Sequence, residues 1–517
     1  MKIKALLTSL LLLCGIQMYG QLIEEICQSP VANSQIHRAP PRKEIRHQLV
    51  DGSQVEAYSA ESRASGDYIT NVFPTQGEIK GIVILAAFAD VPFSTDTIGT
   101  LLSNRYGADN YTEKINIKEY SNVFERELTL QCTIPGSARD YFRAQSFGQF
   151  VPSFDIIGPI TLSQKRSYYG ANNSSGNDKN TAAMIREACQ KAYDLGLNDF
   201  TDYDNDGDGV VDFVYVVYAG YDEAQTGLSE AIWAKTSTVS LTLGNGMKFG
   251  RYACSGELVV DLPVVAGIGT FVHEFSHVLG LPDFYNTKKT DFTLDSWSIM
   301  DYGMYNAEGF VPCSYTSFER YSLGWIPMHT LDAPATMSIG TTDEERKGFR
   351  IFTSEIVADT ASFYLLETIR KEGWNRYAAA NGLLISEVTY LRSAWKGNTV
   401  NTGTHRHCIV PADNNYSYET ANKHLFGTMN HEFSLATMPS SRTQFGVAMN
   451  KPLTEINYNS QTGKTDFLFC GGNIADGLNE IRDRESEAGI YYDLWGRPVK
   501  QPSKGLYILN GKKVMVR

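Results

Sequence analysis

The stretch "HEFSHVLGLPD" (273–283) contains two histidines, a glutamate and an aspartate in close succession. On a helix, His273 and His277 lie four residues apart and point the same way, so both imidazoles can reach one ion. A zinc ion with three protein ligands keeps one position for water, lowers the pKa of that water towards about 7, and needs a nearby carboxylate to accept the proton. Glu274 has the position and the chemistry of that base.

The residues after the second histidine predict a third ligand. Gly280 stands just past the expected helix, where a glycine can adopt a positive φ and turn the chain back beneath the metal. Asp283 follows His277 by six residues and can reach the same ion through a carboxylate oxygen, an acceptable zinc ligand. The alternative is an ordinary amphipathic helix that exposes a His and Glu face and packs its apolar residues inward. Gly280 weakens that alternative.

A second motif lies downstream, in "SWSIMDYG" (296–303). It resembles the Met-turn of the metzincins, whose pattern is SxMxY. The resemblance implies that Met300 lies beneath the zinc ligands and Tyr302 close to the metal, where its hydroxyl would stabilise an oxyanion. The alternative is that Met300 only fills the core and Tyr302 belongs to a surface turn, which the upstream motif weakens.

The order of "HEFSHVLGLPDFY", "SIMDYG" and "SFERYSLGWI" resembles the immune inhibitor A family of secreted metallopeptidases. Further stretches of this resemblance are "ARDYFRAQSFGQF" (138–150), "FDIIGPITL" (154–162), "YYG" (168–170), "DYDNDGDGVVDFVYVVYAGYDEA" (202–224), "FYLLETIRKEGWN" (363–375), "GLLISEV" (382–388) and "WKGNTVN" (395–401). It spans residues 75–472 and implies a secreted zinc endopeptidase with a bound calcium. One departure is Asp283, because metzincins commonly have His at the third ligand position.

Four carboxylates are clustered in "DNDGDGVVD" (204–212), at Asp204, Asp206, Asp208 and Asp212. Such a loop wraps a hard cation, and calcium is the ion we expect. The twelfth position is Tyr215 rather than the bidentate Glu of an EF-hand, and strand-like residues follow, so a helix–loop–helix is not expected. The alternative is a solvated acidic turn, although clustered carboxylates repel one another unless a cation neutralises them.

The pattern along the chain predicts an α+β protein of several parts. With 517 residues the chain exceeds what one hydrophobic core usually serves. Strand and helix signals alternate over 76–330, which predicts a metzincin-like catalytic domain. Short strands separated by Gly, Asn and Asp turns predict a β-rich, sandwich-like accessory domain over 335–472. Residues 475–517 are expected to form a small β module.

Composition excludes some partners. The formal net charge is -12 and no run of Lys and Arg is able to neutralise a nucleic-acid backbone, so nucleic acid is not an expected partner. After the N-terminus no stretch reaches the roughly 18 apolar residues of a spanning helix, so no transmembrane segment is expected. The cysteines are widely spaced without a CxxC pair, which leaves one or two disulfides open.

The N-terminus predicts export. Residues 1–20 have the lysines, the apolar run and the small final residue of a signal peptide cleaved near Gln21. Cys14 lacks the small preceding residues of a lipoprotein box. The polar residues 21–75 are interpreted as a leader or propeptide, in which Cys27 offers a thiolate that could cap the zinc, although no recognisable switch motif surrounds it.

The last residues, with "YDLWGRPV", "KGLYILNG" and "KKVMVR", resemble the C-terminal sorting domain used by type IX secretion in Bacteroidetes. The resemblance implies transit of the outer membrane, contact with the secretion machinery, and a secreted or cell-surface location. The alternative is an extra β-hairpin of the accessory domain.

Together these patterns predict a secreted zinc endopeptidase that is made as a zymogen and acts on proteins or peptides. One rival is a zinc amidase or deacetylase acting on glycans, since it could use the same activated water. The other is a surface protein that binds glycan or host protein through exposed Trp374 and Trp395, with a vestigial zinc site. The intact Glu274 argues against a vestigial zinc site.

Overall fold

The computed structural model describes residues 37–38, 40, 73–94, 97–121, 126–197, 200–259, 264–353 and 361–472, and in the tail 491–492, 498–499, 502, 504–509 and 512–516. The expected signal peptide, Cys14, Cys27 and the cleavage site near Gln21 lie outside these residues. None of the helices in the described ranges is long and apolar enough to cross a membrane.

A seven-stranded sheet forms the first unit, in the order β1-β8-β9-β7-β2-β5 with β6 beside β9. Its strands are β1 (His37–Arg38), β2 (Lys80–Ala87), β5 (Ser153–Thr161), β6 (Val210–Val211), β7 (Val214–Tyr221), β8 (Lys235–Thr242) and β9 (Lys248–Leu258). Strands β5, β2, β7 and β9 run parallel, whereas β8 pairs antiparallel with β9 and β1 antiparallel with β8. The sheet therefore ends in an antiparallel edge.

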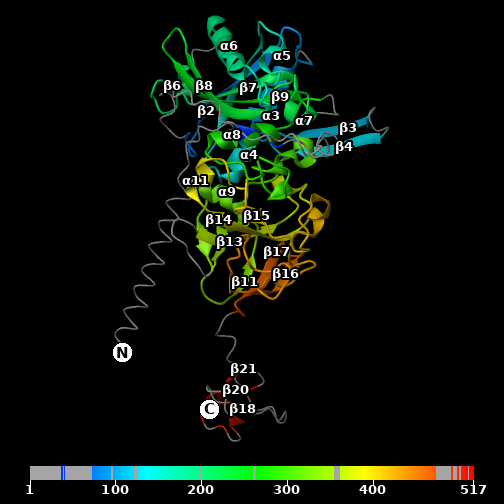
Figure 1. Cartoon of the computed structure of the whole chain (residues 1–517), viewed down its shortest axis with the longest axis vertical. Coiled ribbons are helices and arrows are strands. Elements are labelled where there is room, and N and C mark those ends of the chain that lie inside the picture. Colours follow the sequence, from blue (N-terminus) through cyan, green and yellow to red (C-terminus); the bar gives the residue numbers. More distant parts are fainter. Residues whose placement is uncertain are drawn as a thin grey trace.

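Helices cover both faces of this sheet. Ile82 and Ile84 of β2 pack with residues of α6, and the alternate residues Val83 and Leu85 pack with α3, α4 and α8. Burial on both faces accounts for the continuous apolar run in β2. The helices of the unit are α3 (Ile98–Gly107), α4 (Ala138–Gln145), α5 (Arg166–Tyr169), α6 (Thr181–Asp194), α7 (Glu223–Thr226), α8 (Gly269–Val278) and α9 (Ser317–Ser322). A hairpin of β3 (Glu113–Ser121) and β4 (Arg126–Ile134) projects to one side (Figure 1).

The second unit contains two sheets, β10-β12-β13-β14-β15 and β11-β17-β16. Their strands are β10 (Met328–Thr330), β11 (Ala335–Ile339), β12 (Gly348–Phe352), β13 (Ala361–Ile369), β14 (Gly382–Tyr390), β15 (His407–Ile409), β16 (Leu453–Asn459) and β17 (Lys464–Phe469). The short helices are α10 (Thr342–Glu345) and α11 (Arg392–Lys396). One apolar cluster contains residues of both sheets, among them Ile385 and Phe467.

The two units share a hydrophobic core. Every residue of β13 and β14 is buried. In β13, Phe363 and Leu365 pack into the core that also contains α8, whereas Tyr364 and Leu366 pack towards the three-stranded sheet. The expectation of exposed Trp374 and Trp395 was wrong: they are 8% and 7% exposed, because both indoles belong to this shared core.

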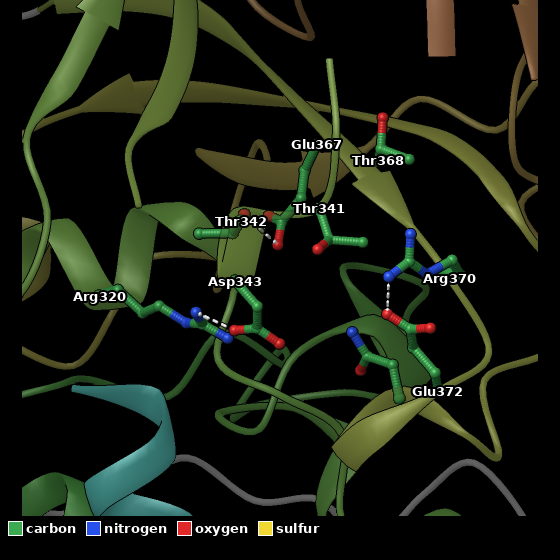
Figure 2. A pocket seen from close by; sticks show the side chains of 9 residues that line it. Arg320, Thr341, Thr342, Asp343, Glu367, Thr368, Arg370 and Glu372 are labelled. Carbon is green, nitrogen blue, oxygen red and sulfur yellow. Dashed lines mark hydrogen bonds and ion pairs between the residues drawn. The ribbon is translucent and has the colours of Figure 1, made fainter. Parts of the chain in front are cut away.

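Polar contacts also join the units, around a pocket at their junction (Figure 2). The buried Arg320 of α9 donates from Nη1 to Oδ1 of Asp343 at 2.6 Å. The backbone N–H of Ser317 donates to Oε2 of Glu367 in β13 at 2.8 Å. These bonds fix the second unit against the helix that follows the metal-binding segment.

The tail forms a separate four-stranded antiparallel sheet in the order β19-β18-β20-β21. Its strands are β18 (Tyr491–Tyr492), β19 (Pro498–Val499), β20 (Gly505–Leu509) and β21 (Lys512–Val516). Six cysteines lie within the described ranges and all six are free thiols, so no disulfide joins these parts of the chain.

Candidate metal centre

Helix α8 contains both predicted histidine ligands and the predicted base. His273, Glu274 and His277 are all buried, and the two imidazole rings lie 4.8 Å apart at 84°. The helix begins at Gly269, where a Cβ would come 2.0 Å from the carbonyl oxygen of Met304. Only glycine allows the helix to approach the following loop this closely.

The turn after α8 brings the third predicted ligand to the histidines. Gly280 has a φ of 103°, as the sequence led us to expect, and its N–H donates to the carbonyl of His277 at 3.0 Å. The chain then returns so that Oδ1 of Asp283 lies 3.5 Å from Nε2 of His273 and 3.1 Å from Nε2 of His277. Zinc ligands at about 2.0–2.2 Å from the ion, arranged tetrahedrally, lie about 3.4 Å apart. The spacing therefore fits a zinc ion.

Backbone carbonyls set the tautomer of both histidines. Nδ1 of His273 lies 2.7 Å from the carbonyl oxygen of Ile299, and Nδ1 of His277 lies 2.7 Å from that of Leu281. Each Nδ1 must therefore donate, which leaves the Nε2 lone pairs directed at Asp283. Nε2 of His273 is buried and makes no hydrogen bond with the described residues. Burial also lowers the pKa of His273, which favours the neutral form that binds metals.

Glu274 is enclosed beside these ligands. Its Oε2 accepts a hydrogen bond from the hydroxyl of Thr236 in β8 at 2.7 Å, while Oε1 is buried and makes no hydrogen bond with the described residues. Burial raises the pKa of Glu274 well above the usual carboxyl range, and the Thr236 hydroxyl opposes that rise. A carboxylate with a raised proton affinity and one open oxygen is suited to accept a proton.

The segment 296–303, expected to form a Met-turn, contacts the centre through its backbone. Besides the Ile299 carbonyl, the carbonyl of Met300 accepts the N–H of Phe284, the residue after the third ligand, at 2.8 Å. Asp301 holds the turn by accepting the N–H of Tyr302 through Oδ1 at 2.8 Å. Met300 is fully buried, and Tyr302 is buried at the start of a 3₁₀ segment, Tyr302–Gly309.

Sequence reasoning missed Glu319, which fixes the Met-turn. Its Oε1 accepts the hydroxyl of Ser298 at 2.6 Å and its Oε2 accepts the N–H of Thr316 at 2.6 Å. Burial raises the pKa of Glu319 to about 7. The Thr316-to-Glu319 spacing is a capping-box signature and predicts the start of α9. It gives no signal for the contact with Ser298, which only the fold creates.

The acidic loop brings together three of its four predicted ligands. Carboxylate oxygens of Asp204, Asp206 and Asp208 lie within 4.8 Å of one another. Asp212 is outside this group, and its Oδ2 accepts both the backbone and the side-chain amide of Asn205 at 2.8 Å. Strand β6 lies within the loop and β7 follows it, so it is not an EF-hand.

Backbone amides of the loop bind its carboxylates. Asp204 accepts the N–H groups of Gly207 and Gly209 at 2.9 and 2.8 Å. Asp208 accepts the N–H of Val210 at 2.8 Å. Burial raises the pKa of Asp212, and the charges of neighbouring carboxylates add to the rise. The loop is thus a folded acidic turn at the surface.

Comparison with known proteins finds a family match for the segment around the centre. Residues 73–326 match the model of the family described as "Immune inhibitor A peptidase M6, catalytic domain". The pre-pro-metalloprotease PrtV of Vibrio cholerae serotype O1 (strain M66-2) is 27% identical over 278 residues, which are 47% of this chain and 29% of PrtV. Immune inhibitor A of Bacillus thuringiensis subsp. alesti is 26% identical over 271 residues, which are 46% of this chain and 38% of that protein.

The chain thus spans well under half the length of these relatives. The match begins shortly before β2 and ends after α9, and so includes both histidines, Glu274 and residues 296–303. The segment that contains the metal centre is therefore similar to the catalytic domain of the immune inhibitor A M6 peptidases.

Proposed function

We propose that this protein is a secreted, zinc-dependent endopeptidase that hydrolyses peptide bonds of extracellular proteins. One observation carries the proposal: within the segment that matches a peptidase family, His273, His277 and Asp283 direct three ligand atoms at one another beside the buried carboxylate of Glu274. Taking such groups out of water is costly unless they are paired or bind a metal.

Each group in the site has a separate role in the proposed hydrolysis. Zinc supplies a water of lowered pKa and an electrophile for the peptide carbonyl. Glu274 accepts the proton of the attacking water through Oε1 and later delivers it to the leaving amine. Thr236 holds the other carboxylate oxygen and so keeps Oε1 directed into the site. The hydroxyl of Tyr302 is proposed to donate to the carbonyl oxygen as that oxygen becomes negative.

The leader supports synthesis as a zymogen. Residues His37 and Arg38 form β1 at the edge of β8, with His37 opposite Thr236, the residue that contacts Glu274. The hydroxyl of Tyr305 donates to the carbonyl of Pro40 at 2.6 Å. An extended peptide commonly binds by adding a strand to a sheet edge. We therefore propose that the leader occupies the edge that an extended substrate would use, and that its cleavage opens the site.

Calcium is the second proposed ion, in the acidic loop. Three carboxylates converge there, and hard cations take carboxylate oxygens as ligands. The proposed ligands are Asp204, Asp206 and Asp208, with Asp212 at the base of the loop. We also propose that the signal peptide directs export and that the C-terminal tail contacts a type IX-like secretion machinery. The protein would then act outside the cell or on its surface.

Digestion of a peptide library, read by mass spectrometry, tests the activity. The full chain is assayed before and after limited proteolysis of its leader, together with Glu274→Ala and the shape-conserving Glu274→Gln. We expect both variants to retain zinc and lose about 10²- to 10⁴-fold in rate, the range for one general base. The exposed Glu230→Ala serves as a control and should cleave normally.

Two outcomes would contradict the proposal. Residual cleavage above a tenth of wild type in both Glu274 variants would remove that residue from the role of base. Intact peptides together with release of acetate or amine from N-acetylated glycans would favour the amidase or deacetylase instead.

A further inference from the structure

The second unit reaches the metal centre through the segment that follows β14. Helix α11 ends at Lys396, and the indole of Trp395 packs against Phe284 and Phe318 with ring centroids 6.3 Å apart in each pair. Phe284 directly follows the third proposed ligand, and Phe318 belongs to α9. Figure 1 shows α11 close to α9, between the two units. This packing places the next residues of the chain, Gly397 and Asn398, against the ligand-bearing turn.

The side chain of Asn398 contacts Asp283 with both ends of its amide. Oδ1 of Asn398 accepts the backbone N–H of Asp283 at 2.8 Å. Nδ2 of Asn398 donates to Oδ2 of Asp283 at 2.5 Å. Because the backbone N–H can only donate, it fixes which end of the amide is the oxygen. The amide nitrogen must therefore face the carboxylate.

This contact orients the carboxylate. Oδ2 is held by Asn398, and Oδ1 is the oxygen that lies 3.1 Å from Nε2 of His277. Because the Asn398 amide is uncharged, it holds Oδ2 and leaves the negative charge of the carboxylate free to attract a cation. Groups that hold a metal ligand in this way commonly change metal affinity by about 10- to 100-fold when they are removed.

The backbone of Asn398 is adapted to this task. Its φ is 51°, a left-handed conformation that asparagine and aspartate tolerate better than most residues. Asn401 secures the same turn at a different point, because its Nδ2 donates to the carbonyl of Phe284 at 2.6 Å. Asn398 therefore holds the carboxylate, and Asn401 holds the backbone.

We propose that Asn398 is a positioning residue for the metal centre, which fixes Asp283 as a monodentate ligand through Oδ1. The proposal rests on the proposed zinc function of Asp283. It places a required part of the centre outside residues 73–326, in the second unit of the molecule. The region that follows the peptidase match thus takes part in building the site.

Zinc affinity of the full chain tests this proposal without reference to activity. Wild type, Asn398→Asp and Asn398→Ala are stripped of metal and titrated with zinc against a chromogenic chelator. Asn398→Asp keeps the shape and the acceptor for the Asp283 N–H but removes the donor to Oδ2. We expect the zinc Kd of both variants to rise by about 10- to 100-fold. The visible spectrum of the Co²⁺-loaded protein should also change, because the ligand geometry changes.

Asn375→Ala is the matched control. Its side chain accepts the N–H of Ser314 at 2.9 Å across the same junction and does not contact Asp283. This variant should bind zinc as wild type does. Unchanged zinc Kd and Co²⁺ spectrum in both Asn398 variants would overturn the proposal while leaving the zinc site standing. Near-UV circular dichroism of the metal-free proteins checks that the variants fold. If both Asn398 variants lose zinc only together with this folded-state signal, the proposal is also overturned. A wild type without stoichiometric zinc would overturn the metal site itself.

Discussion

The metal centre and the acidic loop are both groups of three side chains whose ligand atoms lie within 4.8 Å of one another, but their surroundings are opposite. His273, His277 and Asp283 are buried, whereas Asp206 and Asp208 are exposed. Water can solvate the exposed carboxylates when no ion is bound. The buried group has no such alternative, so its geometry is much stronger support for a bound metal.

The source of the supporting hydrogen bonds differs as well. In the acidic loop, Asp204 and Asp208 accept N–H groups only two to five residues away in the chain. In the metal centre, His273 contacts Ile299, 26 residues away, and Asp283 contacts Asn398, 115 residues away. A local turn can form with or without an ion, whereas two of the three ligands in the centre are held by distant parts of the chain. Three predictions sharpen this contrast.

The largest effect is expected at the third ligand. Asp283→Ala should weaken zinc binding by more than about 100-fold, because loss of a direct ligand exceeds the 10- to 100-fold cost of losing a supporting group. Activity should be lost with the metal. Elemental analysis after dialysis measures the zinc content, and Asp206→Ala is the control that should keep its zinc. A stoichiometric zinc content in Asp283→Ala would place the third ligand elsewhere.

An intermediate effect is expected at the Met-turn. Tyr302→Phe should lower kcat by roughly 10- to 1000-fold without changing zinc content, the range for one lost oxyanion donor. Steady-state kinetics on a peptide found in the library digestion give kcat and KM separately. If kcat stays the same, Tyr302 only contributes to packing of the turn, where its ring lies 6.5 Å from that of Tyr305.

The smallest effect is expected at the acidic loop. Calcium at about 100 times its Kd should stabilise the native state by roughly 2.7 kcal/mol, so EGTA should lower the melting temperature. Zinc content is monitored throughout, since chelators also remove zinc. The double variant Asp206→Ala and Asp208→Ala should give no response to calcium. An equal shift in wild type and in this variant would make the loop a solvated turn.

Local features of the centre were predictable from sequence, and contacts between distant segments were not. The spacing of His273 and His277 and the positive φ of Gly280 follow from helix geometry and from the backbone freedom of glycine. Thr236 and Asn398 lie on other elements, and no short pattern indicates that they meet Glu274 or Asp283. Their roles depend on how the sheets pack.

In the second unit, too, the strands were predictable from sequence, but their packing against the first unit was not. Short strands with turn residues between them predicted a β-rich region, and the described residues 328–472 contain the two sheets. The rival hypothesis of a surface that binds glycan or host protein required Trp374 and Trp395 to be exposed. Instead, Trp374 and Trp395 are buried, since one face of the five-stranded sheet packs on the core of the first unit.

A sheet that is buried on both faces limits how this protein can be cut or recombined. A gene fragment that stops at residue 326 would strip away Phe363 and Leu365 and leave the apolar residues that they cover facing water. A fragment that starts after residue 326 would instead expose Phe363 and Leu365 themselves. Exposed apolar surface of this kind promotes aggregation. For expression work and for exchange of parts during evolution, the smallest transferable unit is therefore the pair, residues 73–472.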